Sequence, residues 1–458
     1  MRLSAWPSLA VISFTLLTAA SAATRPQYGG TLRVATRIAP VSLDPADATL
    51  PDSAARHNLI VLLFDTLVTT DDAGQTQPGL AISWQAQSSY QRWQFWIRAG
   101  VDFQDGSPLR ADAVAASLRV TNSAWTIYPT GNSIVIECGT PDPNLPAELA
   151  LSRNAIAKRT PAGAIFGTGP FRVAEWQPGK KLVLAAQEGY WGGRPFLDSI
   201  VIELDRSSRD QMIALDVGKT DLGEIPVEQV RRLAMQSRRI VTSAPVELMA
   251  LVFVRDSQTA EERRLREALS LSIDRAAIRN VVLQGEGEIA GGILPNWMGG
   301  YEFVFPAAFG LQRAQQIRGE LRQTSTWSLG YDAADPVSRP VAERIALNAR
   351  DAGITLQPSA SPATDIRLMH VLLPSMDSRI ALTSAAISVG MSAPKFASDS
   401  AEDLYQAENT MLQTRRVIPL LHLPAAAYAV GPAVRSFEVD RDGAWHLPDV
   451  WLAGTDRP

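Results

Sequence analysis

The stretch at residues 167–204 constrains the fold most, because it holds three β-type runs separated by glycine and proline. A Gly-Thr-Gly-Pro turn opens it, and runs rich in Val, Ile, Leu and aromatic residues follow at 171–176, 181–186 and 199–204. An aromatic corner at Tyr190 and Trp191 sits over two glycines. Buried aromatic residues at turns mostly supply packing area. The stretch therefore predicts a three-stranded structural block with no catalytic role.

The N-terminus has the order of charges and apolar residues that is typical of a secretory signal peptide. Arg2 precedes an apolar run at residues 9–17, and small residues follow at 19–23. We expect residues 1–23 to be removed, with cleavage after Ala22 or Ala23. The run is too short for a stable membrane-spanning helix, although a membrane anchor remains the alternative. No cysteine lies near the cleavage site, so lipid attachment through one is not expected.

Composition excludes several classes of partner. The chain has 458 residues, a net charge of −4 and a pI of about 5.7, whereas nucleic acid and anionic membrane surfaces require a basic face. Hydrophobic residues make up 46%, enough for a large core of several lobes. Cys138 is the single cysteine, so this core has to stabilise the fold without an internal disulfide.

A second informative run lies at residues 93–118. An alternating strand at 93–98 leads into Gly-Val-x-Phe-x-Asp-Gly-x-Pro at 100–108, and a helix is predicted at 110–118. Earlier, residues 28–35 predict a first strand, residues 40–47 a loop stiffened by Asp44, and residues 58–67 a helix. Later, a helix at 340–352 between strands at 327–332 and 354–356 predicts a βαβ-like unit.

The sequence offers no residue that we would name as a nucleophile, base or metal ligand. Four histidines, His57, His370, His422 and His446, lack metal-type spacing, and neither a Gly-x-Ser-x-Gly elbow nor a catalytic context for the cysteine occurs. Gly218-Lys219-Thr220 is like the end of a phosphate loop, but Ile213 stands where its first glycine should be. We predict that the protein is not an enzyme and needs no cofactor and no metal.

Aromatic walls are the alternative to catalytic chemistry, because binding clefts are lined by apolar side chains with a few fixed charges. Five residues in predicted loops could form such walls, although core packing is an equally good interpretation of each: Trp297, Met298, Tyr301, Tyr331 and Trp445.

Several of these motifs together resemble one family. They are Gly-Thr-Gly-Pro-Phe at 167–171, Tyr-Trp-Gly-Gly-x-Pro at 190–195, Gly-Gly-Thr-Leu at 29–32, Leu-Asp-Pro at 43–45, the run at 100–108, and the segment at 266–275. The chain resembles the extracytoplasmic solute-binding proteins of peptide- and nickel-type ABC importers (family 5). The resemblance is strong at residues 28–118 and 167–300 and weak after 355.

The resemblance implies an α/β fold with two lobes and an extra domain (class II or cluster C type), in which helices flank mixed sheets. We expect the following division: signal peptide 1–23; lobe I from 24–55, 165–245 and 425–458; a trimmed second domain at 56–164; and lobe II at 246–424.

The function implied by the resemblance is capture of a peptide or similar small solute in the periplasm. A monomer that does not span the membrane would deliver this solute to an ABC transporter permease. Two alternatives remain open: a sensory receptor subunit of the same fold, and a secreted hydrolase, for which the sequence offers no nucleophile–base pair.

In peptide-binding members, an aspartate in a loop holds the amino terminus of the ligand. The matching loop here is predicted at residues 365–377, where Asp377 aligns with the motif but Leu373 stands at the position of the amine-binding acid. The amine role is therefore carried over to no residue. Asp44 and Asp377 join the five wall residues as the predicted ligand-binding set, and selectivity is expected in the loops between 291 and 377.

Overall fold

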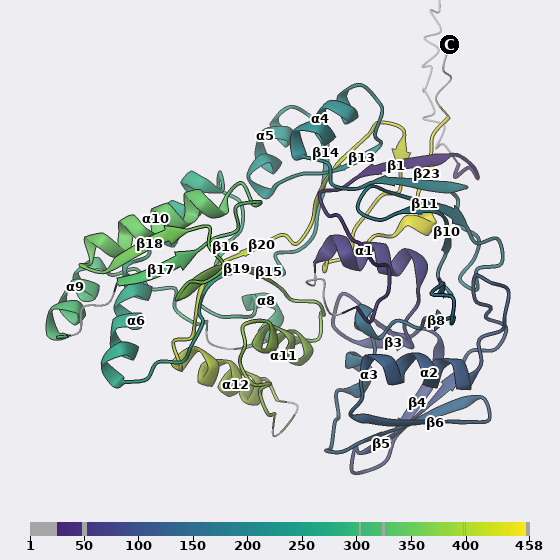
Figure 1. The fold of residues 1–458 in the computed structure, drawn as a ribbon, viewed down its shortest axis with the longest axis horizontal. Helices are drawn as coiled ribbons and strands as arrows, with labels where there is room; N and C mark the ends of the chain where they lie inside the picture. The colour runs from purple at the N-terminus through teal and green to yellow at the C-terminus, as the bar shows by residue number, and fades with distance from the viewer. Residues whose placement is uncertain are drawn as a thin grey trace, which may run out of the picture.

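The computed structural model describes residues 25–47, 53–301, 304–322, 326–396, 398 and 400–454. The predicted signal peptide lies outside them. Figure 1 shows two lobes joined by crossing strands. Lobe I here means the part built on a seven-stranded and a four-stranded sheet, and lobe II the part built on a six-stranded sheet. The predicted two-lobed α/β class with mixed sheets is confirmed, whereas the residue boundaries of the domains stay a prediction.

The three predicted strands of residues 167–204 form one end of the seven-stranded sheet. In spatial order the sheet contains β10 (Phe171–Gln177), β11 (Lys181–Ala186), β12 (Ser199–Glu203), β1 (Thr31–Ala35), β13 (Leu222–Glu224), β21 (Ala427–Val430) and β14 (Arg239–Thr242). β10, β11 and β12 pair antiparallel, and β1 then pairs parallel to β12 with Leu32 opposite Ile200. Both residues are fully buried, so the N-terminal strand and the block share one core.

The four-stranded sheet forms a separate layer of lobe I. Its order is β4 (Ala81–Ala86), β5 (Arg92–Ile97), β7 (Ser133–Cys138) and β6 (Trp125–Thr130). Helix α2 (Ala111–Thr121) packs on it, with Val114 and Leu118 in the same core as Phe95. The predicted strand at 93–98 and helix at 110–118 are therefore both present. The segment after residue 120 contributes the hairpin of β6 and β7 to this sheet.

The six-stranded sheet of lobe II is covered on both faces. Its order is β16 (Glu288–Ile289), β20 (Val417–Leu423), β15 (Glu247–Phe253), β19 (Ile366–Leu372), β17 (Thr326–Gly330) and β18 (Thr355–Ser359). Met249 and Leu251 of β15 belong to one core, and Leu248 and Ala250 to a second core on the opposite face. Successive side chains of β15 point to opposite faces of the sheet, and both faces are buried. This explains why residues 248–253 form a continuous apolar run in the sequence.

The helices of lobe II pack on the two faces of the six-stranded sheet. α10 (Ser338–Asp351) connects the parallel strands β17 and β18, as the βαβ-like pattern predicts, and contributes to the same core as α6 (Ala260–Ser272) and α9 (Leu311–Glu320). The opposite core receives α11 (Ser378–Ser388) and α12 (Ala401–Gln413). The prediction of a loop at residues 365–377 is wrong for the first half of that range. Residues 366–372 form β19, which lies between β15 and β17 in the sheet.

The remaining elements are short or peripheral, apart from α1. They are α1 (Ala54–Leu63), α3 (Leu145–Glu148), α4 (Ser208–Asp216), α5 (Val230–Met235), α7 (Arg275–Ala277), α8 (Asn296–Gly299), β2 (Val68–Thr70), β3 (Thr76–Pro78), β8 (Lys158–Arg159), β9 (Ile165–Phe166), β22 (Val434–Arg435) and β23 (Trp451–Leu452). α1 begins four residues earlier than predicted because the Ser53 side chain caps it, and it ends where Phe64 becomes extended.

Two segments cross between the lobes, one from β14 to β15 and one from β20 to β21. They are hydrogen-bonded to each other: the Ser243 amide donates to the Ala426 carbonyl at 3.0 Å, and the Ala426 amide donates to Ser243 Oγ at 3.2 Å. A paired two-strand connection of this kind permits hinge rotation between lobes. None of the helices in the described residues is both long and apolar enough to cross a bilayer.

Candidate functional site

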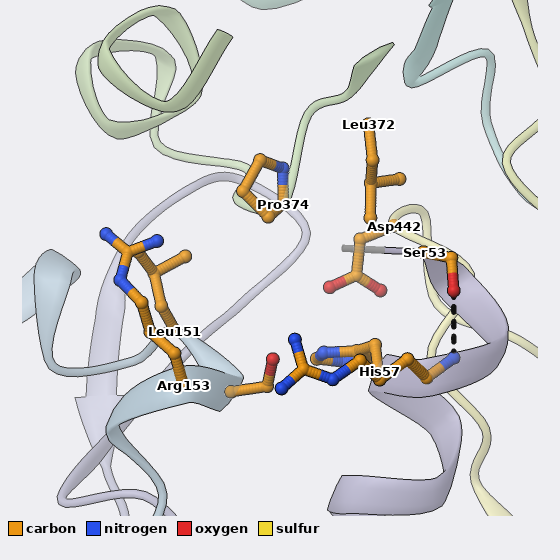
Figure 2. Close-up of a pocket in the computed structure, with 9 residues that line it drawn as sticks. Ser53, His57, Leu151, Arg153, Leu372, Pro374 and Asp442 are labelled. Atoms are coloured by element: carbon orange, nitrogen blue, oxygen red, sulfur yellow. Dashed lines mark hydrogen bonds between the residues drawn. The ribbon is translucent and has the colours of Figure 1, made fainter. Parts of the chain in front are cut away.

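A cavity of about 190 Å³ lies where the two lobes meet, and we call it the interlobe cavity. Helix α1 and the chain that follows it line one side, residues 150–155 and the turn at 440–444 line others, and residues 374–376 of lobe II complete it. A smaller hollow of about 20 Å³, the side hollow, shares His57, Leu151 and Asp442 with it. Figure 2 shows the side hollow, with Asp442 above the helix that carries His57.

A buried asparagine fixes the turn at residues 440–444 against α1. Asn58 is fully buried, and its Nδ2 donates to the Gly443 carbonyl and to the Tyr428 hydroxyl, both at 3.1 Å. Its Oδ1 accepts a bond from the Trp445 amide at 2.9 Å. The same contact holds Asp442, the residue before Gly443, near α1, where Asp442 and His57 both line the side hollow.

Asp65 links the cavity to the aromatic corner of the opening block. Its carboxylate accepts bonds from Tyr190 Oη at 3.0 Å, Trp191 Nε1 at 2.9 Å and Thr168 Oγ1 at 2.7 Å. Burial raises the pKa of Asp65 above its ordinary value, although the three donors oppose that shift. Tyr190 and Trp191 therefore hold the end of α1 in place beside the cavity, which is a positioning role.

A hairpin turn of lobe I touches the backbone of lobe II next to the cavity. Gly74 joins β2 to β3, and a Cβ atom built on it would lie 2.6 Å from the Met376 carbonyl oxygen. Its φ is +79°, which disfavours other residues as well. Gly106 has nearly the same φ, +80°, but nothing lies within 4 Å of its Cβ position. Both glycines therefore have a backbone conformation that other residues rarely adopt. Of the two, Gly74 lies against the other lobe and Gly106 does not.

We expect Gly74→Ala to weaken closure of the lobes, since its methyl group would push the hairpin away from residue 376. Gly106→Ala is the matched control, because it adds the same backbone strain of about 1 kcal/mol without the clash. Small-angle scattering should show a larger radius of gyration for Gly74→Ala than for the control, and the Kd for a bound solute should rise roughly tenfold, which corresponds to ~1.4 kcal/mol. Identical behaviour of the two variants would contradict this role.

The predicted ligand-binding residues lie in several places. Asp44 caps the Ala46 amide and pairs with Arg159, Nε to Oδ2 at 2.8 Å and Nη2 to Oδ1 at 2.5 Å. Burial opposes ionisation, yet these bonds hold the pKa of Asp44 below its ordinary value. Trp445 is buried in the core of lobe I against Tyr428, with ring centroids 5.6 Å apart. Tyr331 packs half-buried against the core of lobe II.

The other four predicted ligand-binding residues also lie in lobe II; they are Trp297, Met298, Tyr301 and Asp377. Arg441 of the cavity turn stacks over Trp297, with its Cζ 5.2 Å from the ring centroid, so this residue contacts lobe I. Met298 packs against the core of α11 and α12, and the Tyr301 hydroxyl donates to Glu408 at 2.7 Å.

Asp377 caps α11 by accepting bonds from the Arg379 and Ile380 amides at 3.0 Å. The nearby Leu373 is fully buried. The lining of the interlobe cavity and side hollow includes none of the seven predicted residues, and their ligand contacts stay predictions.

Sequence reasoning missed the polar residues that line the cavity. His57, Asp65, Arg153 and Asp442 come from four separate segments. Two of them stand out in the sequence and could have been chosen as site candidates. Asp65 interrupts an apolar stretch, and Asp442 belongs to an Asp-Arg-Asp-Gly turn. Within the described part of the chain, no group of three or more His, Cys, Asp or Glu side chains could hold a metal ion.

Known proteins share this architecture. The family model of bacterial extracellular solute-binding proteins, family 5 (middle region), matches residues 75–378. The probable D,D-dipeptide-binding periplasmic protein DdpA of Escherichia coli is 26% identical over 263 residues. The chain spans about half the length of these curated relatives. It covers 51% of DdpA and 55% of the oligopeptide-binding protein AppA of Bacillus subtilis.

Solved structures extend the likeness to the whole fold. AppA of Bacillus subtilis in complex with a nonapeptide superposes with a TM-score of 0.78 at 17% identity, covering 94% of this chain and 100% of AppA. NikA of Staphylococcus aureus in complex with Ni(L-His)2 gives 0.77 at 16% identity, covering 92% and 99%. At these identities the structures establish the fold. With the family match over residues 75–378, they place this chain among the bacterial extracellular solute-binding proteins of family 5.

Proposed function

We propose that this protein captures a peptide or a similar small solute between its lobes, outside the cytoplasm, and delivers it to the permease of an ABC transporter. The observation that carries the proposal is the interlobe cavity, whose lining comes from both lobes beside a paired two-strand connection. A site divided between two hinged bodies is completed when they close, and this closure buries the ligand from both sides.

The finer features of the proposal come from the sequence and the relatives. Export through residues 1–23 to the periplasm agrees with the signal-like N-terminus, and binding without turnover agrees with relatives that are described as binding proteins. Action as a monomer is part of the same proposal. Turnover of an ester or peptide panel by the purified protein would contradict the non-enzymatic role.

A thermal-denaturation screen tests the binding function. The purified protein is heated with peptides, amino acids, sugars, opines and metal chelates, and a true ligand at 100 times its Kd should stabilise the folded state by about 2.7 kcal/mol. We expect a clear rise of the unfolding midpoint with a peptide-like solute. If no solute in the panel raises the midpoint, the proposed function is wrong.

A further inference from the structure

We propose that a further pocket, at the end of lobe II remote from the lobe connection, binds a small organic anion with an aromatic body, such as an aryl phosphate. We call it the distal pocket. The inference goes beyond the proposed function, because among the described residues the distal pocket shares none of its lining with the interlobe cavity or the side hollow. It is carried by the size of the pocket, by the charge of its lining and by donors that have no partner.

The distal pocket is larger than the interlobe cavity. Its volume is about 520 Å³, against about 190 Å³, and this lies within the roughly 300–1,000 Å³ of typical ligand pockets. Its walls come from α6, α12, the segment after α11, the residues that follow β15 and the residue that precedes β20. Figure 1 shows α6 and α12 in the lower part of lobe II. β15 runs from the lobe connection toward this pocket over seven residues, roughly 20 Å, so the two spaces can be occupied independently.

The charge of the lining favours an anion. It contains three cations, Arg263, Lys395 and Arg416, and one carboxylate, Asp256. Asp256 already accepts a bond from Arg416 Nη1 at 2.9 Å. Within the described residues, the side chains of Arg263 and Lys395 have no hydrogen-bond or ion-pair partner. The lining therefore carries an excess of positive charge, although the whole chain has a net charge of −4.

The guanidinium group of Arg416 is fixed at the wall of the pocket. Its side chain is 14% exposed, and it also donates from Nε to the Val389 carbonyl and from Nη2 to the Val254 carbonyl, both at 3.3 Å. Gly390 allows this approach, because a Cβ atom built on it would lie 3.0 Å from Nη2. These contacts leave one N–H on each terminal nitrogen for an anion. A cation that is held in place loses little conformational entropy when a ligand binds.

The rest of the lining combines free hydroxyl groups with apolar side chains. Ser257 and Ser392 line the pocket, and in the part of the chain that the structure describes neither hydroxyl has a partner. Met391 and Met411 contribute apolar surface, and both pack in the core of α11 and α12. Methionine sulfur makes favourable contacts with aromatic rings, whereas an apolar wall gives an inorganic anion no hydrogen bonds in exchange for lost water. Cations and hydroxyls next to methionines therefore fit an anion with an aromatic body.

Calorimetric titration of the full chain with phenyl phosphate, at low ionic strength, tests the inference. Inorganic phosphate and benzyl alcohol are titrated beside it, because each carries one of the two features that the pocket would recognise. We expect the Kd of phenyl phosphate to be about tenfold or more below that of either, since only phenyl phosphate meets the cations and the methionines together. Salt at about 0.15 M should weaken its binding by screening the exposed charges.

Substitutions at the pocket and beside it locate the site. Arg263→Gln should raise the Kd of phenyl phosphate roughly fivefold, the effect of one charge at about 4 Å in water, and addition of Lys395→Gln should bring the rise to roughly 25-fold. Arg264→Gln is the matched control, because Arg264 follows on the same helix but pairs with Glu320 at 2.5 Å and lies outside the lining. Its Kd should stay within about twofold of the unaltered protein. Thr410→Trp keeps every charge and adds an indole to the lining, so it should abolish binding.

Three outcomes would overturn the inference: equal Kd values for Arg263→Gln and Arg264→Gln, undiminished binding by Thr410→Trp, and inorganic phosphate binding as tightly as phenyl phosphate. The solutes of the thermal screen should stabilise the protein that carries Arg263→Gln and Lys395→Gln as much as the unaltered protein, because the distal pocket is separate from the space between the lobes. Absence of stabilisation by every one of those solutes would overturn the proposed function and leave the distal pocket standing.

Discussion

Asn58→Ala is expected to destabilise the protein by ~3–4 kcal/mol, a large effect for one side chain. The substitution removes three hydrogen bonds in a fully buried position and leaves the Gly443 carbonyl, the Trp445 amide and the Tyr428 hydroxyl without their partner. Each unsatisfied buried group costs about 1–3 kcal/mol. Urea unfolding followed by circular dichroism measures the change.

A half-buried asparagine supplies the control for this substitution. Asn348 accepts one bond, from the Asp274 amide at 3.2 Å, so Asn348→Ala should cost about 1 kcal/mol or less. Asn58→Ala should also weaken solute binding, because the turn that carries Asp442 loses its anchor on α1. Equal, small losses of stability in the two variants would show that Asn58 does not hold the turn.

Glu408→Gln should remove a pH-dependent change of about 3 kcal/mol from the free energy of unfolding. Glu408 of α12 is fully buried and accepts bonds from the Ile293 and Leu294 amides and from the Tyr301 hydroxyl. Burial raises its pKa from 4.5 to about 7, against the opposing effect of these donors. The folded protein then binds the proton more tightly than the unfolded chain, so stability falls as pH rises from about 4.5 to about 7.

The neutral amide keeps an acceptor for the backbone amides and removes this titration. The free energy of unfolding of Glu408→Gln, relative to the unaltered protein, should therefore rise by about 3 kcal/mol between pH 4.5 and pH 8, since each pKa unit corresponds to about 1.4 kcal/mol. Glu402→Gln, on an exposed face of the same helix, is the matched control, because it makes the same substitution at a surface position. A difference for Glu408→Gln that stays constant with pH would mean that the buried carboxyl does not titrate in this range.

Local features were predictable because they depend on neighbours in the sequence. Thr259 and Asp274 accept helix-capping bonds from the Glu262 and Ala277 amides, three residues later in the sequence. Gly218 ends α4 with a φ of +67°, and the three strands of residues 171–203 match their pattern of apolar residues. The family resemblance rested on such local motifs, and the family match confirms it.

The candidate site was less accessible to sequence reasoning. Trp297 and Tyr301 lie in a chain segment expected to carry selectivity, but Tyr301 donates to Glu408, 107 residues later in the sequence. Trp445 was predicted as a wall of the cleft, and the fold buries it beside Tyr428. An aromatic residue in a loop has the same sequence signature whether it faces a ligand or a core, because burial depends on which distant segments cover it.

The opening block illustrates the same division. By itself, the sequence of residues 167–204 determined three strands, their turns and a structural role for the aromatic corner. Only the tertiary structure placed Tyr190 and Trp191 on Asp65, more than 100 residues away along the chain. It also brought Asp442, His57 and Pro374 of lobe II together around one hollow. Strands and caps arise from interactions over a few residues, whereas a cavity between lobes exists only after separate segments have packed and fixed the distances between their side chains.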